Sequence, residues 1–114
     1  MITQKEIDEK QIEIEAQAEK LSEELKVKVH PMLFVEGDDF IIGFLKEPDR
    51  ATKTMYLDKV QMSGIGSASS AVCEFLIVKE HSDERILKDD KHFFGACGVV
   101  NQVIQASVNQ FKKK

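Results

Sequence analysis

The chain has 114 residues, is 42% hydrophobic and 32% charged, and carries a net charge of −4, which is typical of one globular domain. Its only basic cluster is the tail Lys112-Lys113-Lys114, so the sequence argues against a nucleic-acid-binding protein. No apolar signal segment opens the chain and no apolar run is long enough for a membrane span, so we expect a cytosolic protein without nucleic-acid or membrane partners.

Residues 3–26 have the pattern of an acidic amphipathic helix. Thr3 and Glu6 show the spacing of a capping box, and Ile2 and Ile7 stand at the flanking staple positions. Residues 1–26 hold eight acidic side chains against four lysines, which is a net charge of −4, so the remaining residues sum to zero. We therefore divide the chain into an acidic helix, 1–26, and a small α+β domain, 27–114.

The apolar side chains of this helix follow heptad spacing and form a narrow seam. A helix that packs into its own domain usually shows a wider apolar face, so this seam indicates contact with one other helix, in the same chain or in a partner. We predict that the seam binds a partner, which includes a second copy of the chain. Its residues are Ile7, Ile14, Ala18, Leu21 and Leu25.

Residues 27–36 and 40–45 predict a β-hairpin around the turn Gly37-Asp38-Asp39. Pro31 restricts the first strand to an edge or to a broken strand, and Gly43 indicates a bulge or a close backbone approach in the second. Two strands alone need helices for support. The hairpin edges are either covered by helices or free to dock an extended segment of a partner, and we predict docking at Phe40, Ile42 and Phe44.

Three helices are expected after the hairpin. Pro48 ends the second strand, and Asp49 is a suitable N-cap for a helix that stops near Gly64. The small-residue segment 64–70, GIGSASS, predicts a loop. Residues 70–80 fit a helix or a buried strand, and their apolar spacing favours the helix.

The last helix is expected at about residues 90–112, capped by Asp89 or Asp90. Its apolar stripe is broad enough for a core. The order of elements predicts an α+β fold with an N-terminal acidic helix, a hairpin and about three packed helices. The stripe contains Phe93, Ala96, Cys97, Val100, Val103, Ile104, Ser107, Val108 and Phe111.

We find no persuasive catalytic, cofactor or metal site in the sequence. The segment GIGSASS follows a helix and lacks the third glycine of a dinucleotide-binding motif. Cys73, His81, His92 and Cys97 lack the short paired spacings of zinc ligands, and nothing in their order brings a histidine to a cysteine nucleophile. We therefore expect a protein that is not an enzyme, has no cofactor, and has two buried reduced thiols.

The segment from Ile42 to Arg50, IGFLKEPDR, resembles a pattern in the tail assembly chaperones of tailed bacteriophages. That pattern is an apolar residue, Gly, an aromatic and a further apolar residue, then charged residues, Pro and a helix. Residues 85–90, leading into 93–104, are similar to the terminal helical segment of those proteins. The resemblance extends over about residues 30–110.

This resemblance implies a non-enzymatic role in phage assembly. Such chaperones coat the helical tape-measure protein and recruit tail-tube subunits, which would place this chain in the host cell cytoplasm during assembly. The acidic helix 3–26 is not part of the pattern, and it leaves open a second function as a structural or auxiliary protein of the virion, in the capsid, connector or tail.

Overall fold

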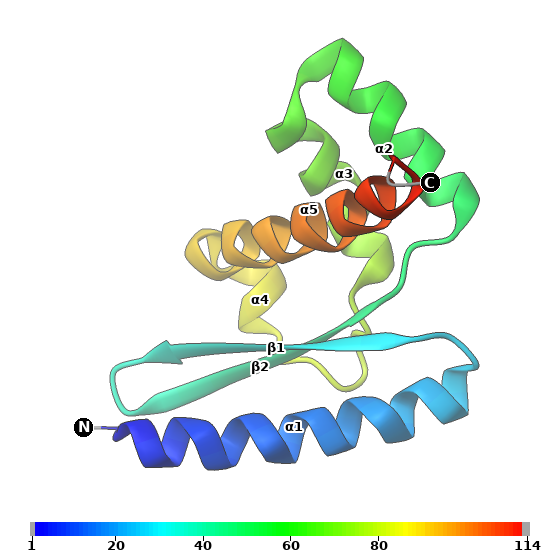
Figure 1. Cartoon of the computed structure of the whole chain (residues 1–114). Helices are drawn as coiled ribbons and strands as arrows, with labels where there is room; N and C mark the ends of the chain where they lie inside the picture. Colours follow the sequence, from blue (N-terminus) through cyan, green and yellow to red (C-terminus); the bar gives the residue numbers. More distant parts are fainter. Residues whose placement is uncertain (1, 113–114) are drawn as a thin grey trace.

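A computed structural model describes the backbone of residues 2–112 and the side chains as far as residue 106 (Figure 1). It confirms the α+β class and the order of an N-terminal helix, a hairpin and further helices. Within the described residues, no helix has both the length and the apolar character needed to cross a membrane. The elements are α1 (Gln4–Leu25), β1 (Val29–Glu36), β2 (Asp39–Lys46), α2 (Arg50–Ser63), α3 (Ile65–Leu76), α4 (Arg85–Lys88) and α5 (Asp90–Lys112).

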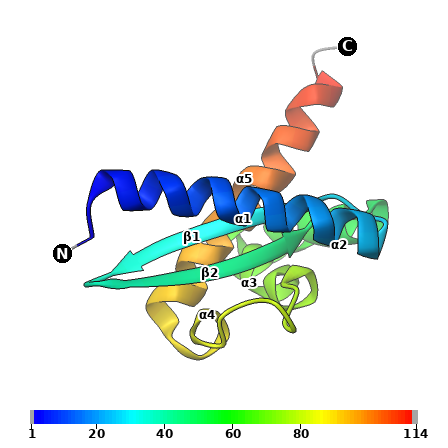
Figure 2. The ribbon, with the colours of Figure 1, turned by 90° about the horizontal axis from the view of Figure 1, so that it is seen from below.

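The hairpin forms the middle of three layers. β1 and β2 pair antiparallel in one continuous register, from Val29 opposite Lys46 to Glu36 opposite Asp39. Figures 1 and 2 show α1 across one face of this ribbon and the other helices across the opposite face. Because side chains alternate along a strand, each strand contributes to both layers. Leu33, Ile42 and Phe44 pack on the α1 side, whereas Met32, Ile41 and Leu45 pack on the side of α3, α4 and α5.

The acidic helix forms as predicted and begins at its predicted cap. The backbone N–H of Glu6 donates to Thr3 Oγ1 at 3.2 Å, and Lys26 ends the helix in the left-handed conformation. The expectation of a second helix against the seam is wrong, because Ile14, Ala18 and Leu21 pack on the hairpin. A two-stranded ribbon is narrow, so a seam of this width is enough to cover one of its faces.

The turn and two special residues of the hairpin follow the sequence. Gly37 has φ 60° at the first turn position, where a two-residue hairpin of type II′ places glycine. Gly43 marks a close approach and no bulge, because a Cβ there would lie 2.4 Å from Ile86 Cδ1. Pro31 stands opposite Phe44, and the backbone N–H and carbonyl of Phe44 form hydrogen bonds on the side away from β1. The two residues are therefore a non-hydrogen-bonded pair, so the N–H that Pro31 lacks is not needed between the strands. β1 therefore runs through Pro31 without a break.

The helix after Pro48 begins at its predicted cap, since Thr52 N–H donates to Asp49 Oδ1 at 2.8 Å. The predicted loop at 64–70 is wrong: only Gly64, with φ 91°, separates α2 from α3. Its small residues are helical because Ala68 and Ser69 are buried, where short side chains let helices approach closely. Residues 70–76 complete α3 as favoured, and Ile77 then forms an isolated bridge with Leu45.

The larger core lies between the hairpin, α3, α4 and α5. Tyr56 fixes α2 to this core, and its hydroxyl hydrogen-bonds to the Asn101 side chain on α5. Asp89 caps α5, as expected for one of the two aspartates, by accepting from Lys91 N–H at 3.1 Å. The predicted stripe of α5 is buried at Ala96, Cys97, Val100 and Ile104, while Ser107, Val108 and Phe111 lie beyond the described side chains.

Candidate functional site

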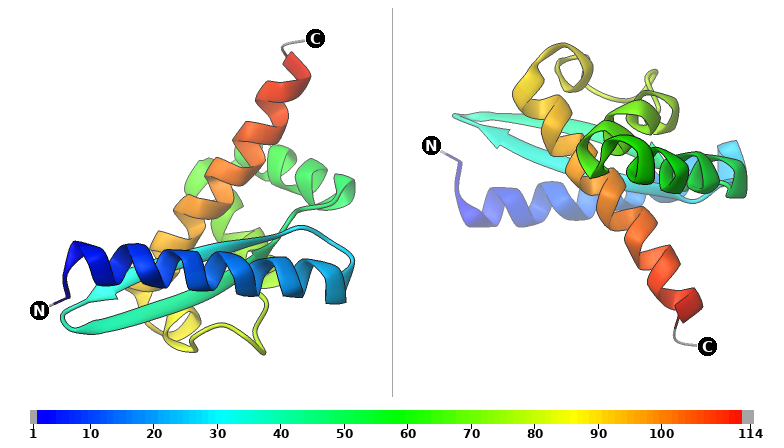
Figure 3. Two further views of the ribbon diagram at one scale, coloured as in Figure 1. Left: turned by 60° about the horizontal axis from the view of Figure 1, so that its bottom comes forward. Right: turned by 90° about the horizontal axis from the view of Figure 1, so that it is seen from above.

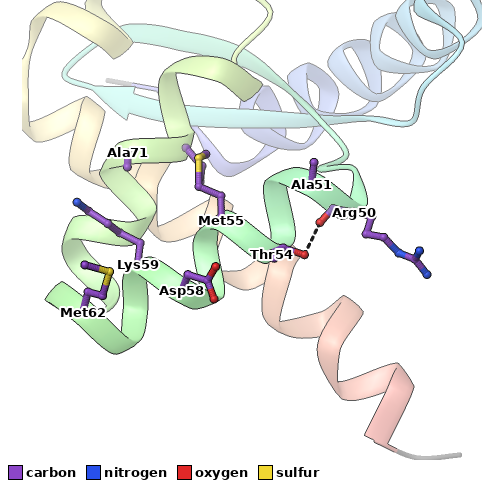
Figure 4. Close-up of a pocket in the computed structure, with 9 residues that line it drawn as sticks. Arg50, Ala51, Thr54, Met55, Asp58, Lys59, Met62 and Ala71 are labelled. Carbon is purple, nitrogen blue, oxygen red and sulfur yellow. Dashed lines mark hydrogen bonds between the residues drawn. The ribbon is translucent and has the colours of Figure 1, made fainter.

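An open groove lies between α2 and α3. Its volume is about 780 Å³. Figures 1 and 3 place α2 at the end of the molecule remote from α1. Figure 4 shows the α2 side chains that line it beside Ala71 of α3, with the Arg50 guanidinium directed away from the others. The lining residues are Arg50, Ala51, Thr54, Met55, Asp58, Lys59, Met62, Ala71 and Val72.

The groove is apolar because α2 carries more apolar side chains than it buries against the core. Tyr56 is the buried residue of α2, and it turns toward α5. Met55 and Leu57 stand on either side of it and remain partly exposed, and Met62 is 83% exposed. Ile65, the first residue of α3, adds a further exposed apolar side chain. Met55 and Met62 line the groove together, and neighbouring exposed apolar residues mark a binding surface more often than single ones do.

The charges on α2 and α1 are opposite. Arg50, Lys53 and Lys59 against Asp58 give α2 a net charge of +2. α1 holds eight acidic residues against three lysines, a net charge of −5. Asp49, at the start of α2, has a pKa below its usual value because Thr52 donates hydrogen bonds to its carboxylate. The groove is therefore a methionine-containing surface on a helix of net positive charge, distant from the acidic helix, and its own lining holds Arg50 and Lys59 against Asp58.

The predicted partner-binding residues fall into two groups. Ile14, Ala18, Leu21 and Phe44 are buried inside the chain, and Ile42 packs against the same cluster. Their contacts are thus already satisfied within the fold. Partner binding by the remaining three stays a prediction: Ile7 and Phe40 are half-buried, and Leu25 is exposed.

The outer edge of β2 is occupied by the chain segment after α3. Val78 N–H donates to the Phe44 carbonyl and Asp83 N–H to the Ile42 carbonyl, both at 2.8 Å. Phe44 N–H in turn donates to Ser82 Oγ at 3.0 Å. An extended partner segment cannot pair with these groups of β2 while residues 77–83 hold them. The cover is a loop that turns at residues 79–81, where the sequence had suggested helices.

The sequence did not identify the groove. The sequence predicted the helix after Pro48 but assigned no role to Met55, Leu57 or Met62. The available signal was that apolar residues at 55, 56, 57, 60 and 62 point around the helix and cannot all face one core. A surplus of apolar residues on one short helix is therefore the pattern that predicts this surface.

The cysteines and histidines considered as ligands or nucleophiles separate in the structure. Cys73 and Cys97 are buried next to each other, and burial raises the pKa of both thiols, so neither is an activated thiolate. His30 pairs with the Glu47 carboxylate, and His92 pairs with Glu36. The group of potential metal ligands among the described residues combines His92 with Glu36 and Asp89.

No protein-family model, curated protein or solved structure matches this chain. The geometry of its own residues therefore carries the functional argument.

Proposed function

We propose that this protein is a non-enzymatic assembly factor that holds an amphipathic helix of a partner in the groove between α2 and α3. The observation that carries the proposal is the groove itself, which places exposed Met55 and Met62 over a floor that includes Val72. Helix-in-groove binding uses such a surface, in which apolar anchors of the guest helix at i, i+3 or i+4 and i+7 enter between two host helices.

Methionine suits a host surface that must accept a helix of imperfect fit. Its unbranched side chain has three rotatable bonds and a polarizable sulfur, so it adapts to different apolar anchors. The charge of +2 on α2 favours a guest whose apolar stripe is flanked by acidic residues. These properties support binding of a helical protein more than binding of a small polar substrate.

The resemblance of residues 42–50 to tail assembly chaperones supports the class of partner. A tape-measure protein is long and helical, and its apolar stripes need a cover until the tail forms. The function that we propose is accordingly that of a chaperone-like factor in bacteriophage tail assembly, acting in the host cytoplasm. The second candidate function is that of a structural or auxiliary protein that stays in the virion, and the experiments below distinguish it from a chaperone.

Co-expression with the tape-measure protein encoded in the same genome tests the proposal. We expect the wild-type chain to keep the tape-measure protein soluble and to co-purify with it. Met55→Glu combined with Met62→Glu places two charges in the groove and should abolish co-purification. Both side chains are exposed, so the fold should remain intact by circular dichroism.

The matched control is Ile12→Glu combined with Phe94→Glu, which adds the same charge at exposed apolar positions of α1 and α5. This control should co-purify like the wild type. The proposal fails if the tape-measure protein does not bind, or if the groove variant and the control behave alike. Mass spectrometry of purified particles separates the two phage functions, since a chaperone is absent from virions and a structural subunit is present in many copies.

Self-association through the groove is a further outcome of the same variants. If the acidic α1 of a second copy were the guest, light scattering would show a larger particle for the wild-type protein alone. The groove variant would then be monomeric without any partner, and the proposed heterologous guest would be incorrect.

A further inference from the structure

A cluster of three potential metal ligands lies at the end of β1, apart from the groove. His92 Nε2 is 2.7 Å from Glu36 Oε2 and 3.9 Å from Asp89 Oδ2. One ligand atom from each residue falls within 4.8 Å of the others. The cluster joins the end of the hairpin to the first turn of α5, two elements that are far apart in the sequence.

The fold holds the imidazole of His92 in place. His92 is only 4% exposed, and its ring lies against Phe34 with 6.0 Å between ring centroids. Asp89 and His92 stand three positions apart at the start of α5, so their side chains share one face of the helix. Asp89 uses Oδ1 for the helix cap, while Oδ2 is the oxygen nearer to His92.

The two carboxylates are open to solvent, so an ion can reach the buried nitrogen. The side chains of Glu36 and Asp89 are 43% and 44% exposed, against 5% for His92. A buried imidazole with two accessible carboxylates differs from an ordinary acidic patch, because its nitrogen donor is fixed before the ion arrives. This arrangement corresponds to an open coordination site with three protein ligands.

We propose that Glu36, Asp89 and His92 bind a divalent first-row transition-metal ion, with Zn²⁺ as the representative ion. Zn²⁺ accepts His nitrogen and carboxylate oxygen at about 2.0–2.2 Å, and tetrahedral ligands at that radius are about 3.4 Å apart. The two separations from His92 Nε2, 2.7 and 3.9 Å, lie on either side of this value. Glu36 is at an exposed strand end, so an adjustment of about 1 Å completes the geometry.

Lys91 competes with the ion for Glu36. Its Nζ lies 3.2 Å from Glu36 Oε1, and its side chain is exposed. This ammonium group repels a cation bound at the other oxygen of the same carboxylate, Oε2. Replacing Lys91 by Met removes the competing charge and keeps a flexible side chain of similar length, so the affinity for Zn²⁺ should rise.

Titration of the tag-free, full-length protein with Zn²⁺ by isothermal calorimetry tests the proposal. We expect one ion per chain and a higher thermal unfolding temperature with the metal, because the ion links the hairpin to α5. Glu36→Gln and Asp89→Asn should each weaken the affinity by about tenfold or more. Asn also serves as an N-cap, so Asp89→Asn keeps the start of α5.

The matched control is Glu47→Gln. Glu47 pairs with His30 as Glu36 pairs with His92, but Glu47 is not part of the three-ligand cluster. This control should bind Zn²⁺ like the wild type, while Lys91→Met should bind more tightly. The proposal is overturned if the wild type shows no saturable binding, or if Glu36→Gln and Glu47→Gln have equal affinities. Cobalt absorption spectra of the wild type and Asp89→Asn provide a second readout that depends on the ligands themselves.

Discussion

The two faces of the hairpin are covered by different means. On one face, α1 packs a narrow seam of three buried residues against the ribbon. On the other face, α3, α4 and α5 build a larger core that also holds Tyr56 of α2. The middle of the seam is buried within the chain, whereas α2 keeps Met55, Leu57 and Met62 exposed. The comparison shows that the centre of a heptad-like seam can be buried inside one chain, while a helix without such a pattern carries the open groove.

The largest expected effect comes from the α1 face. Ile14→Ala removes a side chain that is 1% exposed and should lower the free energy of unfolding by about 2–5 kcal/mol. Ile12→Ala, two residues earlier on the same helix, changes a residue that is 69% exposed and should stay within about 0.5 kcal/mol of the wild type. Urea denaturation measures both. Equal effects of the two substitutions would show that α1 does not rest on the hairpin by this seam.

The packing of α4 against the hairpin can be tested at Gly43, where the two elements come very close. Gly43→Ala places a methyl group 2.4 Å from Ile86 Cδ1 and 3.0 Å from Met32 Cε, and should destabilise the protein by about 1–3 kcal/mol. Gly98→Ala is the matched control, since no atom lies within 4 Å of its added Cβ. This helical substitution should raise stability by up to about 1 kcal/mol. A neutral result at Gly43 would mean that the ends of the Ile86 and Met32 side chains move aside to make room for the methyl group.

A smaller, pH-dependent effect is expected where α4 meets the end of the hairpin. Arg85 hydrogen-bonds to Asp83 and Asp39, and its bonds to Asp83 lower the pKa of that carboxyl group. A lowered folded pKa gives stability that is present above the usual value of about 3.9 and is lost as pH falls through the folded value.

Asp83→Asn removes this contribution, so it should destabilise the protein at pH 7 and differ little from the wild type near pH 2. Denaturation midpoints at the two pH values measure the difference. A destabilisation that persists unchanged in acid would assign the role of Asp83 to its shape and to its hydrogen bond with the Arg85 N–H, and not to its charge.

Local signals predicted most of the fold. Thr3 and Asp49 cap helices where their spacing indicated, and Gly43 stands at a close approach. The segment 64–70 was misjudged because small residues predict a loop by local preference, whereas in the structure Ala68 and Ser69 pack within a helix. Tertiary contacts override propensity at such positions.

Partners of a surface are harder to predict than the elements that form it. The narrow seam of α1 would suit a ribbon or a helix equally well, and the sequence does not state which of them covers it. The exposed state of Met62 depends on the placement of Tyr56 against α5, which is a long-range contact. The histidine–carboxylate cluster likewise joins residues 36 and 92, whose separation along the chain hides their contact.

The position of Pro31 has a consequence for how the chain behaves at high concentration. Strands as apolar as residues 33–35 and 40–45 are prone to stack with identical strands of other molecules into aggregates. Pro31 offers no N–H on the outer side of β1, the N–H of Val29 is taken by Ser22 Oγ, and residues 77–83 cover β2. These features leave fewer backbone groups at both margins for pairing with another strand, which lowers the tendency of the ribbon to aggregate.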